Sequence, residues 1–569
     1  MSAGSAHAGH RRLAALALAI GFFVLQIPAL SDFTRYHGDE RFYTDAAIGM
    51  VQSGDWLTPR YPDGRLRFEK PLLGYLAISA SYTVFGIDLF SSRLPFLLAG
   101  ALLVWMTWWA GVRLLGDGEA ALLAAAIMAA SPDVLALAQR STPDMLVWLF
   151  LLVGLTGFAL LLRERGRTGR AAALAWLGAG LASAAKGGLG PLLVGYAFAC
   201  AALSRERALL VRRLLHPVWL PAGLIVGAAG FGVYALGHDA SELSRSVSDQ
   251  VGGHVRTLGA LVRTFGAYAA IPFEHLAPWI GLAAIGMLRD RASLGEIERR
   301  AGWLARYAAG WMLVLLCVFA AASVVRGRYL ASGYPLLVLV LAFALVTLSR
   351  RAAADALLRS VCRAALWAAG IGGVLLAAAG ARIGAGVAAA GLACLAVAGT
   401  SLAAGRRRTA SAALLGLAVT FLAVQTVAAQ EIRARFSPAP VEPLAARLLA
   451  PELAGARVAQ VGESAHLASK LRVATGGRVR IDGFARGGSE PNWCAYDVVV
   501  SDTPLPESVA ALGFRSEPCG EIGADDWTLR EALDVLGAAD TDAALAQRAR
   551  PAWISVRTRA ADAACGARS

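Results

Sequence analysis

The sequence predicts a polytopic α-helical membrane protein with about 13 transmembrane helices, followed by a small C-terminal α/β extracytoplasmic domain. Of its 569 residues, 57% are hydrophobic and only 17% are charged. The apolar residues gather in runs that are long enough, or nearly long enough, to cross a bilayer. After Gln430 the composition becomes more charged and richer in proline. We therefore expect a transmembrane domain over residues 1–429 and an α/β domain over residues 430–569.

The first apolar run, at residues 13–30, follows Arg11 and Arg12 and has the layout of a signal peptide. No small-residue cleavage site follows it, and it is long enough to span, so we favour an uncleaved anchor. Twelve further runs follow along the chain. They lie at residues 94–115, 120–131, 145–162, 171–185, 189–203, 218–236, 276–288, 304–324, 329–348, 364–379, 383–404 and 410–429.

The loops between these runs predict the orientation. The net charge is +14, and the arginines gather in short loops near residues 163–170, 205–213, 289–300, 350–363 and 406–408. With the N-terminus in the cytoplasm, alternation places every one of these loops inside, as the positive-inside rule requires. This pattern argues against a nucleic-acid-binding surface. It also places the first loop, the loop over residues 237–275 and the C-terminal domain outside.

The C-terminal segment has the pattern of a small α/β domain. Strands are expected at residues 457–461, 478–481 and 496–501, and helices at 441–449 and 465–474. Of the seven cysteines, Cys494 and Cys519 lie in the body of this domain, where disulfides form. We expect them to form a bridge, the alternative being two buried thiols.

Charged residues cluster on the predicted outer face, where apolar runs begin or end. Acidic residues alone are common at helix starts, because they favour the positive end of the helix dipole. Several acids beside two lysines at one membrane face are less common, and such charges mark functional sites. The cluster contains Asp39, Glu40, Glu69, Lys70, Asp144 and Lys186. A carboxylate can act as a general base, and cations can stabilise a phosphate leaving group.

The ordered motifs resemble those of the C-type membrane glycosyltransferases, most closely the bacterial lipid A aminoarabinose transferases, with protein O-mannosyltransferases more distant. The specific part is the first loop, and shorter matches continue over roughly the first 350 residues. The motifs are Asp39-Glu40 with Tyr43, Ser53-Gly54-Asp55-Trp56-Leu57 with Pro59, Phe68-Glu69-Lys70-Pro71-Leu72 with Tyr75, Phe85-Gly86, Ser92-Arg93-Leu94-Pro95, Asp144, Lys186-Gly187, Pro278-Trp279, and Tyr329 with Pro335. The stretch from Glu40 to Val51 looks helical and amphipathic, so we expect amphipathic helices in the first outer loop.

The resemblance also implies roles for residues. Those at the catalytic centre would be Asp39, Glu40 and Asp144. Those binding the donor phosphate and substrate would be Tyr43, Glu69, Lys70, Lys186, Arg256, Arg326, Arg328 and Tyr329. Family members can carry a divalent metal near the glutamate that Glu69 matches, but we predict no required cofactor. A lone histidine such as His254 is more often a surface residue than a ligand.

We therefore expect an integral membrane glycosyltransferase in the bacterial inner (cytoplasmic) membrane. It would move a sugar from a polyprenyl-phosphate carrier, such as undecaprenyl phosphate, to a lipid or glycan acceptor, with lipid A of lipopolysaccharide as the first guess. Its partners would be the donor, a lipid-linked acceptor and membrane lipids, with no nucleic acid. The alternatives are a protein O-mannosyltransferase-like enzyme, a flippase or transporter of polyprenyl-linked sugars, and a non-catalytic scaffold. A transporter would favour paired halves and broken helices around a midplane site.

Overall fold

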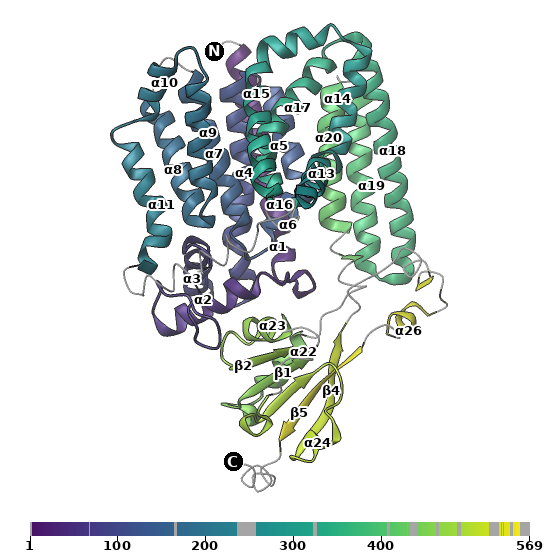
Figure 1. The fold of residues 1–569 in the computed structure, drawn as a ribbon. Coiled ribbons are helices and arrows are strands. Elements are labelled where there is room, and N and C mark those ends of the chain that lie inside the picture. Colours follow the sequence, from purple (N-terminus) through teal and green to yellow (C-terminus); the bar gives the residue numbers. More distant parts are fainter. Residues whose placement is uncertain are drawn as a thin grey trace.

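The computed structural model consists of a large helical bundle and a smaller domain built on a β-sheet (Figure 1). It describes residues 3–67, 69–163, 168–235, 258–321, 327–406, 410–428, 431–432, 441–462, 466–485, 491–522, 534–535, 538, 540–546 and 550–557. The N-terminus lies at one end of the bundle, and the sheet domain lies beyond the opposite end (Figure 1).

The helices of the bundle follow the apolar runs of the sequence. The first half contains α1 (Ala3–Leu30), α2 (Arg41–Ser53), α3 (Leu73–Phe85), α4 (Leu89–Leu115), α5 (Gly118–Ala129), α6 (Pro132–Ala138), α7 (Asp144–Arg163), α8 (Thr168–Lys186), α9 (Leu189–Ala202), α10 (Arg207–Leu214) and α11 (Trp219–Ala235). The second half contains α13 (Leu258–His275), α14 (Ala277–Arg289), α15 (Ser293–Ala320), α16 (Gly327–Leu330), α17 (Tyr334–Ser349), α18 (Ala352–Ile383), α19 (Ala385–Arg406) and α20 (Ala410–Ala423).

Within the described residues, 8 helices are long and apolar enough to cross a membrane, or up to 11 if each bent pair forms one span. The expected span over residues 120–131 corresponds to α5, and the chain then bends by 60° into α6, which begins at Pro132 beyond the expected span. The expected span over residues 276–288 is α14, which meets α13 at 79°. The end of the expected loop over residues 237–275 is therefore helical. A polytopic helical protein is confirmed, while the number of 13 spans stays a prediction.

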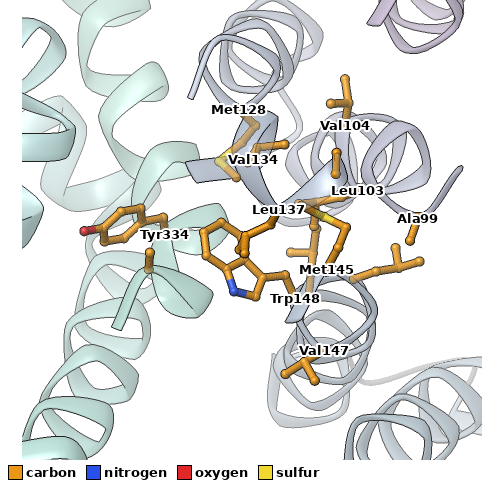
Figure 2. Packing of buried hydrophobic residues seen from close by; sticks show 14 of the residues in the cluster. Ala99, Leu103, Val104, Met128, Val134, Leu137, Met145, Val147, Trp148 and Tyr334 are labelled. Atoms are coloured by element: carbon orange, nitrogen blue, oxygen red, sulfur yellow. The ribbon is translucent and has the colours of Figure 1, made fainter. Parts of the chain in front are cut away.

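Small residues allow α7 and α8 to pack closely against each other. A Cβ atom added at Gly157 of α7 would lie 2.2 Å from the backbone nitrogen of Ala175 in α8, and one at Gly178 would lie 2.4 Å from the nitrogen of Gly154. Glycine is required at such contacts, which are typical of membrane helices. On its other side α7 packs into the core, where the rings of Trp148 and Tyr334 meet edge to face with centroids 6.4 Å apart (Figure 2).

The loop between α1 and α4 contains α2 and α3, as expected for a first loop with helices of its own. Both lie at the end of the bundle that faces the sheet domain (Figure 1). Helix α2 places Ala46, Ala47 and Met50 in the interior, so it is one-sided as the sequence predicts.

The C-terminal domain contains five strands: β1 (Val458–Gly462), β2 (Ile481–Ala485), β3 (Val498–Ser501), β4 (Phe514–Ile522) and β5 (Arg550–Arg557). Their order is β2-β1-β3-β5-β4; β1 is parallel to both of its neighbours, and β5 is antiparallel to both of its own. Its helices are α22 (Val441–Leu448), α23 (His466–Ala474), α24 (Glu507–Ala510) and α26 (Thr541–Ala546).

The α/β pattern expected for this segment is present, with differences in detail. β1, β3, α22 and α23 lie where the sequence predicts them. The strand expected at residues 478–481 begins only at Ile481, and β4 and β5 were not predicted. The predicted disulfide is wrong: Cys519 is a free thiol, while Cys494 is disulfide-bonded to a partner outside the described residues. Spacing along the chain does not fix which sulfur atoms meet, since that depends on strand order.

Candidate active site

Asp39 lies just before α2, at the end of the bundle that faces the C-terminal domain. Its Oδ2 atom accepts a 2.6 Å hydrogen bond from the guanidinium group of Arg328, which lies in α16. The backbone N–H of Asp39 donates to Nδ1 of His37 at 3.2 Å. Burial, and then the charge of Arg140, lower the pKa of His37, which favours the neutral ring that this contact needs. With 29% of its side chain exposed, Asp39 is held in place but accessible.

Asp144 and Lys186 form a second ion pair beside the first. Asp144 is the first residue of α7 and Lys186 the last of α8, so each charge also suits the helix dipole at its end. The ammonium group of Lys186 lies 4.2 Å from the centroid of the Tyr329 ring, and the guanidinium group of Arg328 lies 5.5 Å from it. The indole N–H of Trp148 donates to the backbone carbonyl of Arg328 at 3.3 Å, which ties α16 to α7.

Lys70 joins this cluster from the first loop. Burial, and then the nearby charge of Lys186, lower its pKa below the ordinary value. The charges of Tyr329 and Asp144 act on it in the opposite direction. The structure therefore brings together Asp39, Asp144, Lys70, Lys186, Arg328 and Tyr329, all of them predicted from the sequence.

Glu69 and Tyr43 lie in an adjoining layer of arginine and tyrosine side chains. The Glu69 carboxylate accepts from the Tyr61 hydroxyl at 2.5 Å and lies 3.2 Å from the guanidinium group of Arg67. Tyr43 is buried, with its ring centroid 5.1 Å from that of Tyr75, whose hydroxyl accepts from Nε of Arg67 at 2.7 Å. Arg67 thus joins Glu69 to the aromatic residues, although the sequence motifs did not identify it.

Glu40 is fully buried, with no exposed surface, and pairs with Arg93 of α4. Its two carboxylate oxygens accept from Arg93 at 2.9 and 3.0 Å, from the backbone N–H of Ser141 at 2.9 Å and from that of His37 at 2.7 Å. Burial alone would raise the pKa of Glu40, but Arg93 and the backbone donors lower it below the ordinary value. Such a group can anchor the first loop on α4.

Arg140 is a site residue that the sequence analysis missed. It lies between α6 and α7, four residues before Asp144. Burial lowers its pKa, Glu40 and Asp144 raise it, and the nearby cations Arg328 and Arg93 lower it further. Among the described residues no ion pair or side-chain hydrogen bond engages its guanidinium group. Like Lys186, Arg140 lies beside an expected span, and this position could have identified it from the sequence.

Two predicted phosphate ligands, Arg256 and Arg326, and also His254, lie outside the described residues. A divalent metal near Glu69 was considered possible but not required, and it stays a prediction. Within the described part of the chain no group of three or more histidine, cysteine or acidic side chains could hold a metal ion. The Glu69 carboxylate faces Arg67 rather than further oxygen ligands, and this is not a donor set for a divalent cation.

Comparison with known proteins finds likenesses to membrane glycosyltransferases. A family model described as dolichyl-phosphate-mannose-protein mannosyltransferase matches residues 69–229. The undecaprenyl phosphate-α-4-amino-4-deoxy-L-arabinose arabinosyl transferase of Enterobacter sp. (strain 638) is 29% identical over 163 residues, 29% of each chain. The protein of that name from Pectobacterium carotovorum subsp. carotovorum (strain PC1) is 26% identical over 342 residues, 58% of this chain and 57% of its own. The matched part thus spans between 29% and 57% of these relatives' lengths.

The solved structures extend the likeness over almost the whole fold. The crystal structure of ArnT from Cupriavidus metallidurans bound to undecaprenyl phosphate aligns with a TM-score of 0.62 at 19% identity, covering 95% of this chain and 97% of the other. The apo structure of the same protein aligns equally well, with a TM-score of 0.62. The chain therefore has the fold of these enzymes, and its resemblance to the C-type membrane glycosyltransferases, with the aminoarabinose transferases among its relatives, is confirmed.

Proposed function

We propose that this protein is a membrane glycosyltransferase that moves a sugar from a polyprenyl-phosphate carrier to a lipid-linked glycan, with lipid A as the first acceptor to test. The observation that carries the proposal is the group of four cations, Lys70, Arg140, Lys186 and Arg328, around Asp39 and Asp144. The cations outnumber the carboxylates, so the cluster suits a phosphate group. The curated relatives are named for transfer from undecaprenyl phosphate, which supports the same donor class.

Each charged group has a defined part in this reaction. Asp39 takes the proton of the acceptor hydroxyl, and the oxygen attacks the anomeric carbon of the donor sugar. The bond from that carbon to the carrier phosphate breaks, and the phosphate leaves with its electron pair. Lys70, Lys186 and Arg140 stabilise the charge that develops on it. A single displacement of this kind inverts the anomeric centre.

Other residues position these groups. Arg328 fixes the Asp39 carboxylate, and Asp144 holds the Lys186 ammonium group. We assign Glu40 a positioning role, because its carboxylate is enclosed by Arg93 and two backbone donors.

The proposed location is the outer face of the bacterial inner membrane, with an outer C-terminal domain. Helix α10, which carries Arg212 and Arg213, lies at the end with the N-terminus, away from the site (Figure 1). By the positive-inside rule this basic end is cytoplasmic. The full count of 13 spans belongs to the same proposal.

The test uses the full-length protein in liposomes with a labelled polyprenyl-phosphate sugar. Asp39→Asn should lower the transfer rate by about 10²–10⁴-fold, because it removes the general base. Asp55→Asn is the matched control. Asp55 is an exposed acid in the same loop, and its carboxylate accepts a hydrogen bond from the backbone N–H of Leu57. This variant should retain the wild-type rate.

Transfer by Asp39→Asn at the wild-type rate would exclude Asp39 as the base. Movement of the donor across the bilayer without transfer would instead identify a flippase. Label recovered on protein rather than on lipid would point to the mannosyltransferase-like alternative, which the description of the matching family favours.

A further inference from the structure

The short helix α16 carries two residues of the candidate site, Arg328 and Tyr329. It is four residues long, and a helix of this length is not stable alone, so its neighbours must hold it in place. The indole N–H of Trp148 in α7 donates to the Arg328 carbonyl at 3.3 Å, and the rings of Tyr329 and Phe319 have centroids 5.1 Å apart. The position of α16 matters for the reaction because the Arg328 guanidinium group fixes Asp39.

A further neighbour of α16 is His275, the last residue of α13. A Cβ atom added at Gly327, the first residue of α16, would lie 3.1 Å from Cε1 of the His275 ring, so this ring packs directly on the α16 backbone. The His275 ring also meets the Tyr334 ring edge to face, with centroids 6.0 Å apart. Tyr334 in turn packs against Trp148 (Figure 2). Two side chains that hold α16, His275 and Trp148, are therefore connected through one tyrosine.

His275 is paired with Asp133, an acid that takes no part in the proposed reaction. Its Nδ1 atom lies 2.6 Å from Oδ2 of Asp133, and the Tyr334 hydroxyl lies 3.3 Å from the same nitrogen. Both side chains are mostly buried, with 25% of His275 and 17% of Asp133 exposed. His275 ends α13 and Asp133 lies in the first turn of α6, so a positive and a negative charge at these places suit the two helix dipoles.

The pair joins segments on two sides of the candidate site. Asp133 lies in α6, which leads through Arg140 into α7, and His275 lies where α13 meets α14 at 79°. Removing one partner of a largely buried pair leaves the other charge uncompensated, which is strongly unfavourable. Within the described part of the chain, the neighbouring acid Glu274 is exposed and forms no ion pair. Asp133 is therefore the carboxylate that fixes the His275 ring.

We propose that His275 and Asp133 are positioning residues for the transfer reaction. Their ion pair holds the His275 ring against α16, and this contact keeps Arg328 on Asp39. The inference rests on the proposed function and adds two residues through which the general base is held. Lys186 keeps its own partner, Asp144, so loss of the pair should lower kcat and leave the KM for the donor nearly unchanged.

Steady-state kinetics of the full-length protein in liposomes, with a labelled polyprenyl-phosphate sugar, test the assignment. His275→Gln and Asp133→Asn should each lower kcat by about tenfold to about 10²-fold, the effect of displacing a catalytic group by up to about 1 Å. Glu274→Gln is the matched control for Asp133→Asn. His10→Gln, at an exposed histidine of α1 near the opposite end of the bundle, is the control for His275→Gln (Figure 1). Both controls should keep the wild-type rate.

The double variant His275→Gln/Asp133→Asn distinguishes a coupled pair from two independent roles. Residues that act through one contact are not additive, so the double variant should be no slower than the slower single variant. Amide hydrogen exchange, which needs no substrate, gives a second measurement. Residues 327–330 should exchange faster in both single variants, while α10 at the other end of the bundle should exchange as in the wild type. Faster exchange confined to the region of α16 separates loss of this contact from unfolding.

Unchanged kcat and unchanged exchange in both single variants would overturn the proposal. Losses in kcat that multiply in the double variant would overturn it too, since the two residues would then act separately. Faster exchange in α16 with a wild-type kcat would show a pair with a structural role only, and a raised donor KM with a wild-type kcat would place the pair at the donor; either result excludes the proposed role. Absence of transfer by the wild type, with faster α16 exchange in both variants, would support the clamp on α16 and refute only the proposed reaction.

Discussion

Asp39 and Glu40 are adjacent in the sequence but have opposite surroundings. Asp39 is partly exposed and forms an ion pair with Arg328. Glu40 is enclosed and paired with Arg93, a residue 53 positions away. The motif in the sequence contains both acids and cannot separate them, because the pairing depends on how α4 packs against the first loop. We therefore assign the proton transfer to Asp39 and the anchoring of the loop to Glu40.

Lys70 gives a pH-dependent prediction at the scale of one side chain. Its pKa is lowered by burial and by Lys186, whereas a bound phosphate would favour its charged form. A basic group with a lowered pKa loses its proton at a lower pH than the ordinary value of about 10.4. The affinity for undecaprenyl phosphate should therefore be highest at neutral pH and fall as the pH rises through the lowered pKa of Lys70.

The measurement is the Kd of undecaprenyl phosphate from about pH 7 to about pH 10, for wild type and Lys70→Arg. An arginine stays charged over this range, so the variant should lose the alkaline decline in affinity. Lys470→Arg, which alters a lysine of α23, should retain it. The same decline in all three proteins would remove Lys70 from the phosphate site.

At the scale of elements, helix α23 packs directly on the backbone that precedes Asp39. A Cβ atom at Gly38 would lie 2.6 Å from Cε1 and 2.8 Å from Nε2 of His466. A side chain at this position would require the His466 ring to move, and the contact couples the C-terminal domain to the catalytic loop. The sequence predicted α23 and the charged loop separately, because both are local patterns. Their contact joins segments more than 400 residues apart, and no local pattern reports it.

Gly38→Ala should therefore displace the His466 ring, and with it α23 or the Asp39 backbone. Overpacking of this kind costs about 1–3 kcal/mol, and a displacement of about 1 Å at a catalytic group can lower a rate by about 10²-fold. We expect a lower transfer rate and faster amide hydrogen exchange in α23. His466→Ala in the same chain should restore both. Gly49→Ala is the control, since a Cβ atom there meets nothing within 4 Å. A Gly38→Ala protein with unchanged rate and exchange would refute the coupling.

At the scale of the whole molecule, the sequence predicted the class of the fold better than its bends and its edge strands. Hydropathy and arginine clusters predicted the helical class and the positions of most helices, because lipid requires long apolar runs. The bends at Pro132 and between α13 and α14 were not predicted, since they depend on packing against neighbouring helices. The outer pair of strands β4 and β5 was missed because their sequences mix charged residues and proline with apolar ones.

The basic loops predict which side of the membrane each end of the bundle faces. Arg291 is exposed between α14 and α15, next to a basic segment, and Glu507 is exposed at the start of α24 in the C-terminal domain. Single cysteines at these two positions, in a background with Cys317 and Cys519 replaced by serine, can be labelled in intact spheroplasts with a membrane-impermeant maleimide. The Glu507→Cys protein should label at once, and the Arg291→Cys protein only after permeabilisation, because basic loops stay in the cytoplasm. Labelling of both from the same side would contradict the arrangement of the bundle. Reversed labelling would place Asp39 in the cytoplasm, where nucleotide sugars are available, and the proposed polyprenyl-phosphate donor would lose its main support.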